Sequence, residues 1–141
     1  MTRIAAIAVV LFWAVAGPAL GARARFQAID VWVDGGEQPL AAYQVELGYD
    51  RTSASLVGIE GGDKPFSEPP HYDPRGLTRG RVMLAAFTLE KNLVRGRVRV
   101  ARIHFEERGD ARLEVRLVVA GTAGGENLSA TATLEPTGEQ R

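Results

Sequence analysis

The chain of 141 residues contains no cysteine, so disulfides and cysteine-based metal sites are excluded. It has only two histidines, His71 and His104, which leaves few imidazoles for catalysis. Neither charge is in excess, because 17 basic residues balance 17 acidic ones, and a neutral chain lacks the basic face of a typical nucleic-acid binder. These absences indicate one small domain that is held together by its hydrophobic core and not by covalent or metal crosslinks.

One long hydrophobic run is present, at the start of the chain. Arg3 precedes twelve uncharged apolar residues, Ile4 to Val15, and Gly17-Pro18 and several small residues follow. Such a run is too short for a bilayer core, which needs about 20 residues, but it is typical of a signal peptide. We expect residues 1–24 to be a signal peptide, cleaved after Gly21 or Ala24. Residues 25–141 would then be an exported domain, periplasmic or extracellular, with no membrane span.

The remaining residues show the period of two that is typical of strands. The clearest case is Leu40 to Tyr49, in which Tyr43, Val45, Leu47 and Tyr49 alternate with smaller or polar residues. No window of eleven or more residues has a helical period. Strands are predicted at Phe26–Val33, Leu40–Tyr49, Ser55–Glu60, Arg81–Leu89, Arg97–Phe105, Ala111–Ala120 and Leu128–Leu134. The sequence therefore predicts an all-β antiparallel sandwich with almost no helix.

Two stretches depart from regular alternation. Residues 61–79 contain four of the seven prolines and are predicted to form a long loop, because proline lacks the N–H that an interior strand donates. Within Arg97–Phe105, Val98 and Val100 share one parity, whereas Ala101, Ile103 and Phe105 share the other. A single shift of this kind predicts a β-bulge or a strand that crosses between sheets.

The Arg81–Leu89 stretch is apolar on both parities. We assign the first of its two faces to the core, which gives a predicted core of Tyr43, Val45, Leu47, Tyr49, Met83, Phe87, Ile103, Leu113, Val115 and Leu117. The other face, Val82, Leu84 and Ala86, would then point outward. An outward apolar row needs a cover. Either the loop from Asp63 to Leu77 or a partner protein would supply it.

No catalytic or metal site is predicted. His104 lies between Ile103 and Phe105 on the outward parity of a strand, and His71 lies in the proline-rich loop with no Cys or Ser elbow to pair with it. Asp63, Glu68 and Asp73 near His71 lack a recognised ligand spacing. The alternating arginines around Arg97 are interleaved with glutamates, which favours cross-strand ion pairs over a phosphate-binding face. We therefore expect neither an enzyme nor a cofactor.

The stretch LAAYQVELGYDRTSASLVGIEGGD, residues 40–63, resembles the cohesin domain, in which an alternating strand ends in a Tyr-Asp pair and a Leu-Val-Gly-Ile strand and a glycine-rich turn follow. RVMLAAFT, residues 81–88, and GRVRVARIHFEE, residues 96–107, are similar to two later strands of that family. Together these blocks give a resemblance over nearly all of residues 29–134.

The resemblance implies a nine-stranded jelly-roll sandwich with a short or missing opening strand. It also implies a non-catalytic module that binds another protein, as cohesins bind calcium-loaded dockerin, through one sheet face. At the positions where that family places the Asn and Asp that contact dockerin, this chain has Ala42 and Gln44, so those polar contacts are not carried over. The predicted partner-binding residues are Ala42, Gln44, Val82, Leu84, Ala86 and Thr88.

Carbohydrate binding is the alternative function, since related sandwiches bind polysaccharides. It would require exposed aromatic residues on which sugar rings can stack. The candidates are Trp32, Phe66 and Tyr72, and Trp32 has the outward parity of its strand.

Overall fold

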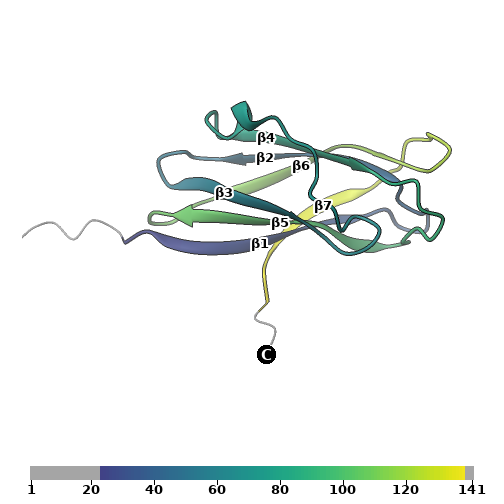
Figure 1. Ribbon diagram of the computed structural model, residues 1–141, viewed down its shortest axis with the longest axis horizontal. Helices are drawn as coiled ribbons and strands as arrows, with labels where there is room; N and C mark the ends of the chain where they lie inside the picture. The colour runs from purple at the N-terminus through teal and green to yellow at the C-terminus, as the bar shows by residue number, and fades with distance from the viewer. Residues whose placement is uncertain (1–22, 139–141) are drawn as a thin grey trace, which may run out of the picture.

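The structure is a computed structural model that describes residues 23–138, and these form two packed layers of antiparallel strands (Figure 1). The strands are β1 (Arg25–Asp34), β2 (Ala42–Tyr49), β3 (Ala54–Gly61), β4 (Arg81–Phe87), β5 (Arg97–Glu107), β6 (Leu113–Gly121) and β7 (Thr131–Pro136). A single 3-10 turn, η1 (Pro74–Gly76), is the one helical element of the described residues. The prediction of an all-β chain is confirmed. The predicted signal peptide falls almost entirely on residues 1–22, outside the described part.

One layer is a four-stranded sheet in the order β3-β5-β1-β7, and the other is a three-stranded sheet in the order β4-β2-β6. The cohesin resemblance implies nine strands, but residues 23–138 form seven. Along the free edge of β4, where a further strand would pair, His71 alone forms a bridge to Ala85. Its backbone N–H donates to the Ala85 carbonyl at 2.8 Å, and the Ala85 N–H donates back at 3.0 Å.

The core lies between the layers and is made by the inward parity of each strand. Tyr43, Val45, Leu47 and Tyr49 of β2 are buried, as predicted, and so is Ile103 of β5. The predicted core residues of β6 are half-buried and pack against the margin of this core; they are Leu113, Val115 and Leu117. The alternation of β2 therefore gave the correct face.

The phase change in β5 is a β-bulge, as predicted. Val31 of β1 lies opposite Ala101 and Trp32 lies opposite Arg99, so Val100 is the extra residue on β5. Val100 and Ala101 are both fully buried although they are adjacent in sequence. The bulge lets the strand keep apolar residues on the core side in both of its halves.

The faces predicted for β4 are wrong. Ala86, Leu84 and Val82 lie opposite Tyr43, Val45 and Leu47 of β2, and residues opposite each other in a ladder point to the same side of the sheet. Val82 and Leu84 are consequently fully buried in the core. Met83 and Ala85 are half-buried on the outer face, and the Phe87 side chain is 74% exposed. Because β4 is apolar on both parities, only its register with β2 determines which set is inside.

The proline-rich loop is fixed to the edge of the sandwich. Phe66 is 2% exposed and packs edge-on against Tyr43, with ring centroids 5.3 Å apart. Gly62 lies so close to β5 that a Cβ there would be 1.9 Å from the Arg99 carbonyl oxygen, so only glycine fits. Further along, the Tyr49 hydroxyl donates to the Leu77 carbonyl at 2.8 Å. The loop thus closes the core at its side and leaves Phe87 uncovered.

Candidate functional site

The outer face of the three-stranded sheet changes character along its length. At one end, Phe87, Ala42 and Gly121 lie side by side on β4, β2 and β6, and Ala85, Gln44 and Val119 form the next row. At the other end, Arg81 lies beside Gly48, which lies beside Glu114. We call Ala42, Ala85, Phe87, Leu89 and Val119 the apolar end of this face.

A groove of about 860 Å³ runs over the apolar end. Its floor includes Ala42, Gln44 and Ala85, and Phe87 and Leu89 stand beside it with 74% and 89% of their surface exposed. After β4, the Thr88 N–H donates to the Ala41 carbonyl at 2.9 Å, which continues the pairing with the β2 side by one residue. The Thr88 hydroxyl accepts from the Glu90 N–H at 3.1 Å, and the exposed Leu89 lies between these two residues.

Polar and acidic residues form the rim of the groove. They are Glu68 and His71 of the proline-rich loop and Thr88 and Glu90, which follow β4. An apolar floor with a polar rim is the usual composition of a protein-binding surface. Exposed apolar residues that gather in one place carry more meaning than the same residues scattered singly.

The structure brings part of the predicted partner-binding set together. Ala42, Gln44 and Thr88 line the groove, as does the edge of Ala86, although Ala86 also packs against the core. Val82 and Leu84 are excluded from any surface because both are fully buried. Phe87, which was predicted to lie in the core, and Leu89 are the most exposed apolar side chains of this face. The sequence does show that both faces of β4 are apolar. Which of the two faces is exposed depends on the register of β4 with β2.

The three aromatic residues predicted for glycan binding do not form a platform. Phe66 is buried against Tyr43, so its prediction as an exposed stacking residue is wrong. Trp32 lies on β1 of the four-stranded sheet, where the guanidinium carbon of Arg97 covers its ring at 3.9 Å from the centroid. Tyr72 follows His71 beside β4 of the other sheet and packs against the core. Trp32 and Tyr72 therefore belong to different sheets.

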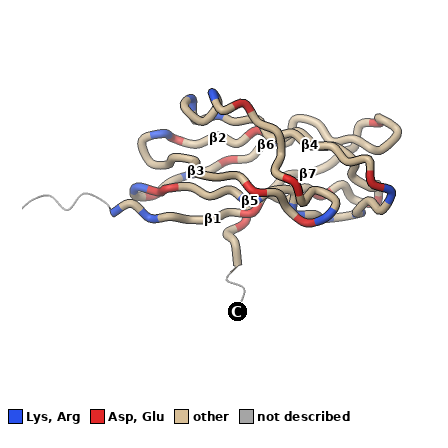
Figure 2. The backbone as a smooth tube through the Cα atoms, viewed as in Figure 1, with Lys and Arg blue, Asp and Glu red and all other residues tan. Residues whose placement is uncertain are grey.

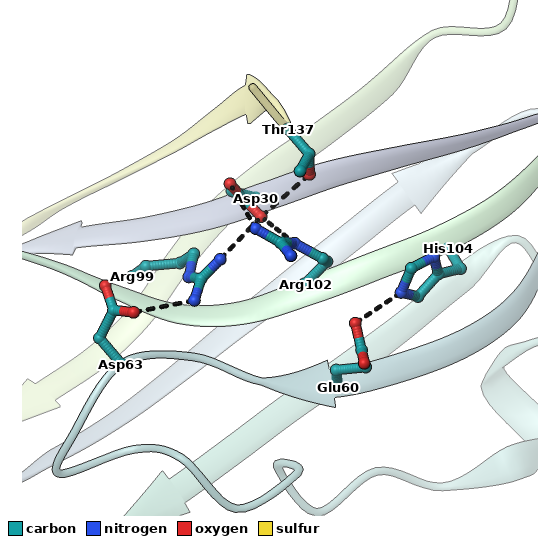
Figure 3. Close-up of polar contacts among 7 residues, drawn as sticks. All are labelled: Asp30, Glu60, Asp63, Arg99, Arg102, His104 and Thr137. Carbon is teal, nitrogen blue, oxygen red and sulfur yellow. Dashed lines mark hydrogen bonds and ion pairs between the residues drawn. The ribbon is translucent and has the colours of Figure 1, made fainter. Parts of the chain in front are cut away.

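The outer face of the four-stranded sheet carries a network of ion pairs (Figure 3). Arg102 Nε donates to Asp30 Oδ1 at 2.8 Å, and the Thr137 hydroxyl donates to the same oxygen at 3.0 Å. Arg99 Nη2 donates to Asp63 Oδ1 at 2.8 Å, which ties the proline-rich loop to β5. Arg97 likewise pairs with Glu135 of β7. The arginine-rich strand thus forms ion pairs with neighbouring segments, as predicted, but with Asp30, Asp63 and Glu135 and not with the glutamates interleaved in the sequence.

Asp30 is the one buried charged residue of the described part, at 6% exposure. Burial alone would raise the pKa of its carboxyl, but the hydrogen bonds from Arg102 and Thr137 and the charges of Arg102 and Arg99 outweigh it and lower the pKa. Asp30 stays ionised at neutral pH and joins β1, β5 and the residue that follows β7. Its role is structural.

Each of the two histidines takes part in a contact between neighbouring segments. His104 lies on the outer face of β5, and its Nε2 is 2.6 Å from Glu60 Oε2; the same contact lowers the pKa of Glu60. The backbone of His71 forms the β-bridge to Ala85 at the edge of β4. Among residues 23–138 no three His, Asp or Glu side chains are grouped so that they could hold a metal ion. The same residues contain no helix that is long and apolar enough to cross a membrane.

Comparison with known proteins identifies the fold. A crystal structure of the seventh type I cohesin of ScaB from Pseudobacteroides cellulosolvens superposes with a TM-score of 0.53 at 12% sequence identity. The match covers 82% of this chain and 86% of that chain. No family model and no curated protein matches the sequence. The chain thus has a cohesin-like β-sandwich fold, in agreement with the resemblance in its sequence.

Proposed function

We propose that this chain is a non-catalytic module that binds another protein through the apolar end of its three-stranded sheet. The observation that carries the proposal is the exposed position of Phe87 and Leu89 beside a groove with an apolar floor. Large apolar side chains that stand clear of the surface lose hydration when a partner covers them, and such aromatic anchors dominate binding energies. Ala42 and Gln44 would lie under the partner.

The cohesin-like fold supports the same class of function. Cohesins are receptor modules that bind another protein through one sheet face. The groove of this chain also lies on a sheet face. A dockerin-like partner is one candidate that follows from it. The apolar Ala42 in place of a polar residue favours a partner whose contact here is apolar.

We also propose that the domain acts outside the cytoplasm after residues 1–24 have been removed. The support is the order of Arg3, the short apolar run and the small residues after Gly17-Pro18. A chain without cysteine needs no oxidising compartment for its fold, so export would serve its partner and not its stability.

A site-specific crosslink tests the binding surface. A photoreactive phenylalanine analogue at position 87 should capture a distinct protein from the secreted fraction of the host. The same analogue at Phe26, which is 76% exposed on β1 of the other sheet, is the matched control. Capture from position 87 but not 26 supports the proposal. Equal capture from both positions would show that the apolar end has no special role.

Carbohydrate binding can be tested directly, although the three aromatic residues predicted for it do not lie together. Trp32 is the only tryptophan after residue 24, so its fluorescence reports on that ring alone. We expect no change when soluble glucans are added to the wild type. The variant Arg97→Ala, which uncovers the ring, should also show none. A saturable change in either protein would favour the glycan function.

A further inference from the structure

We infer that the partner presents one bipolar segment to the three-stranded sheet, apolar where it meets Phe87 and acidic where it reaches a group of arginines at the far end. The inference rests on the proposed function and adds the chemistry of the partner. The far end is the arginine end, which we define as Arg79, Arg81, Arg112 and Arg116.

The arginine end has its own cleft on the same outer face. This cleft measures about 440 Å³, and Arg79, Arg81, Arg112 and Glu114 line it. In Figure 2 several basic positions lie in the β2–β3 turn and the η1 loop at this end of the sandwich, with acidic positions beside them. The groove at the opposite end of the face has Glu68 and Glu90 on its rim. The face is therefore polarised along β2.

The arginine end has positive charge that the protein itself does not neutralise. Glu46 Oε1 is shared by Arg81 at 3.8 Å and Arg116 at 3.4 Å, so one carboxylate serves two guanidinium groups. Arg79 and Arg112 have no ion-pair partner among residues 23–138.

The two carboxylates that line the cleft are Asp50 and Glu114. Asp50 Oδ1 already accepts the backbone N–H of Thr52 at 2.9 Å and its hydroxyl at 2.8 Å. These hydrogen bonds lower the pKa of Asp50 and hold its carboxylate to the β2–β3 turn. Outside the cleft, the charge of Arg79 also helps to lower the pKa of Asp73, but that carboxylate already pairs with Arg75. Within the cleft, Glu114 is the carboxylate left for Arg79 and Arg112. A partner with carboxylates would supply the missing counter-charges.

The length of the face fixes the spacing in the partner. Ala42 at the apolar end and Gly48 beside Arg81 are six strand residues apart, which corresponds to roughly 20 Å at about 3.3 Å per residue. A helix covers that distance in about 13 residues, at 1.5 Å per residue. The apolar anchors and the carboxylates of the segment should therefore lie about 20 Å apart, which corresponds to about 13 residues where the segment is a helix.

The orientation of the segment follows from the same charges. Carboxylates at the apolar end would face Glu68 and Glu90, and like charges in contact are unfavourable. Carboxylates at the other end would face Arg79 and Arg112. The acidic part of the partner should consequently lie over the start of β4 and β6, and its apolar part over the end of β4.

Two matched synthetic peptides test the inference. Each is a helix of about 20 residues with three leucines at one end of one face. The first has three glutamates at the other end of that face, and the second has three lysines there. Their affinities are measured by calorimetry for the wild type, for Arg79→Glu/Arg112→Glu and for Phe87→Glu. The control Arg25→Glu/Arg108→Glu makes the same charge change at exposed positions at one end of the other sheet, where it also removes the ion pairs with Glu107 and Glu106.

We expect the glutamate peptide to bind the wild type about tenfold more tightly than the lysine peptide, since a few exposed ion pairs contribute up to about 1 kcal/mol each. Arg79→Glu/Arg112→Glu should reverse this preference, and the control should keep it. Equal binding of both peptides, or a preference that the reversal leaves unchanged, would overturn the inference and leave the proposed function intact. If neither peptide binds, or if Phe87→Glu binds them as well as the wild type, the proposed function fails as well.

Discussion

Leu84 on β4 lies directly opposite Val45 on β2, and both side chains are fully buried between the two sheets. A charge at position 84 would have to enter this core without a partner. Leu84→Glu should therefore lose most or all of a stability that is typically about 5–15 kcal/mol. Thermal unfolding followed by circular dichroism measures the loss. A native melting curve for this variant would show that the register of β4 is wrong.

Phe87, three residues further along β4, should tolerate the same chemical change. Its side chain is 74% exposed, so a glutamate there stays in water. We expect Phe87→Glu to alter the free energy of unfolding by no more than about 0.5 kcal/mol, as for ordinary surface positions. The comparison with Leu84→Glu separates the two faces of β4 in one pair of proteins. Unfolding of Phe87→Glu would mean that the chain itself covers this residue.

Leu47 tests the packing of the core that the alternation of β2 predicted. It is fully buried and packs within the main hydrophobic cluster. Truncation to alanine should cost about 2–5 kcal/mol, through lost burial and the cavity left behind. Leu89→Ala is the matched control, because Leu89 is 89% exposed. Chemical denaturation gives both values, and similar losses in the two variants would contradict the assigned core.

Asp30 should make stability depend on pH in the acid range. Because its folded pKa lies below the ordinary value, the stabilisation is complete above the unfolded pKa of about 3.9 and is lost as the pH falls through the folded pKa. Asp30→Asn should cost about 1–3 kcal/mol near neutral pH, the range for hydrogen bonds to a charged group. The gap to the wild type should narrow below about pH 4.

Denaturant titrations at several pH values measure this gap. Asp110→Asn serves as the control, since Asp110 is exposed and forms no ion pair within the described residues. A gap that stays constant between neutral pH and pH 3 would show that the Asp30 network does not contribute through its charge.

The exported protein should begin at Ala22 or Arg25, after cleavage behind Gly21 or Ala24. Intact-mass spectrometry of material recovered outside the cytoplasm checks this. Exported protein that still begins at Met1 would exclude the cleaved signal peptide.

Local patterns were sufficient to predict the strands and the buried face of β2. β2 is apolar on one parity alone, so its buried face followed from the sequence, and the adjacent apolar residues Val100 and Ala101 already marked the bulge in β5. These features are decided within a few neighbouring residues. The folded chain changes only their exact ends.

The binding surface could not be predicted in the same way. Both parities of β4 are apolar, so the position of Phe87 depends on its pairing with Ala42, 45 residues earlier in the chain. Phe66 lies between prolines and charged residues, and its burial depends on the gap beside Tyr43. Contacts between distant segments determine both positions. For that reason Leu84 and Phe87 exchanged roles between the prediction and the structure.

The most direct test of the central claim is partner capture by three forms of the whole domain, compared by quantitative mass spectrometry of the host's secreted fraction. The forms are the wild type, Phe87→Glu, and Phe26→Glu as the control with an equally exposed phenylalanine on the other sheet. We predict that the wild type and Phe26→Glu retain one protein in equal amounts, and that Phe87→Glu retains at least tenfold less of it. A tenfold loss corresponds to about 1.4 kcal/mol of binding free energy, which is typical of a binding anchor. Equal retention by the wild type and a folded Phe87→Glu would contradict a binding site at the apolar end.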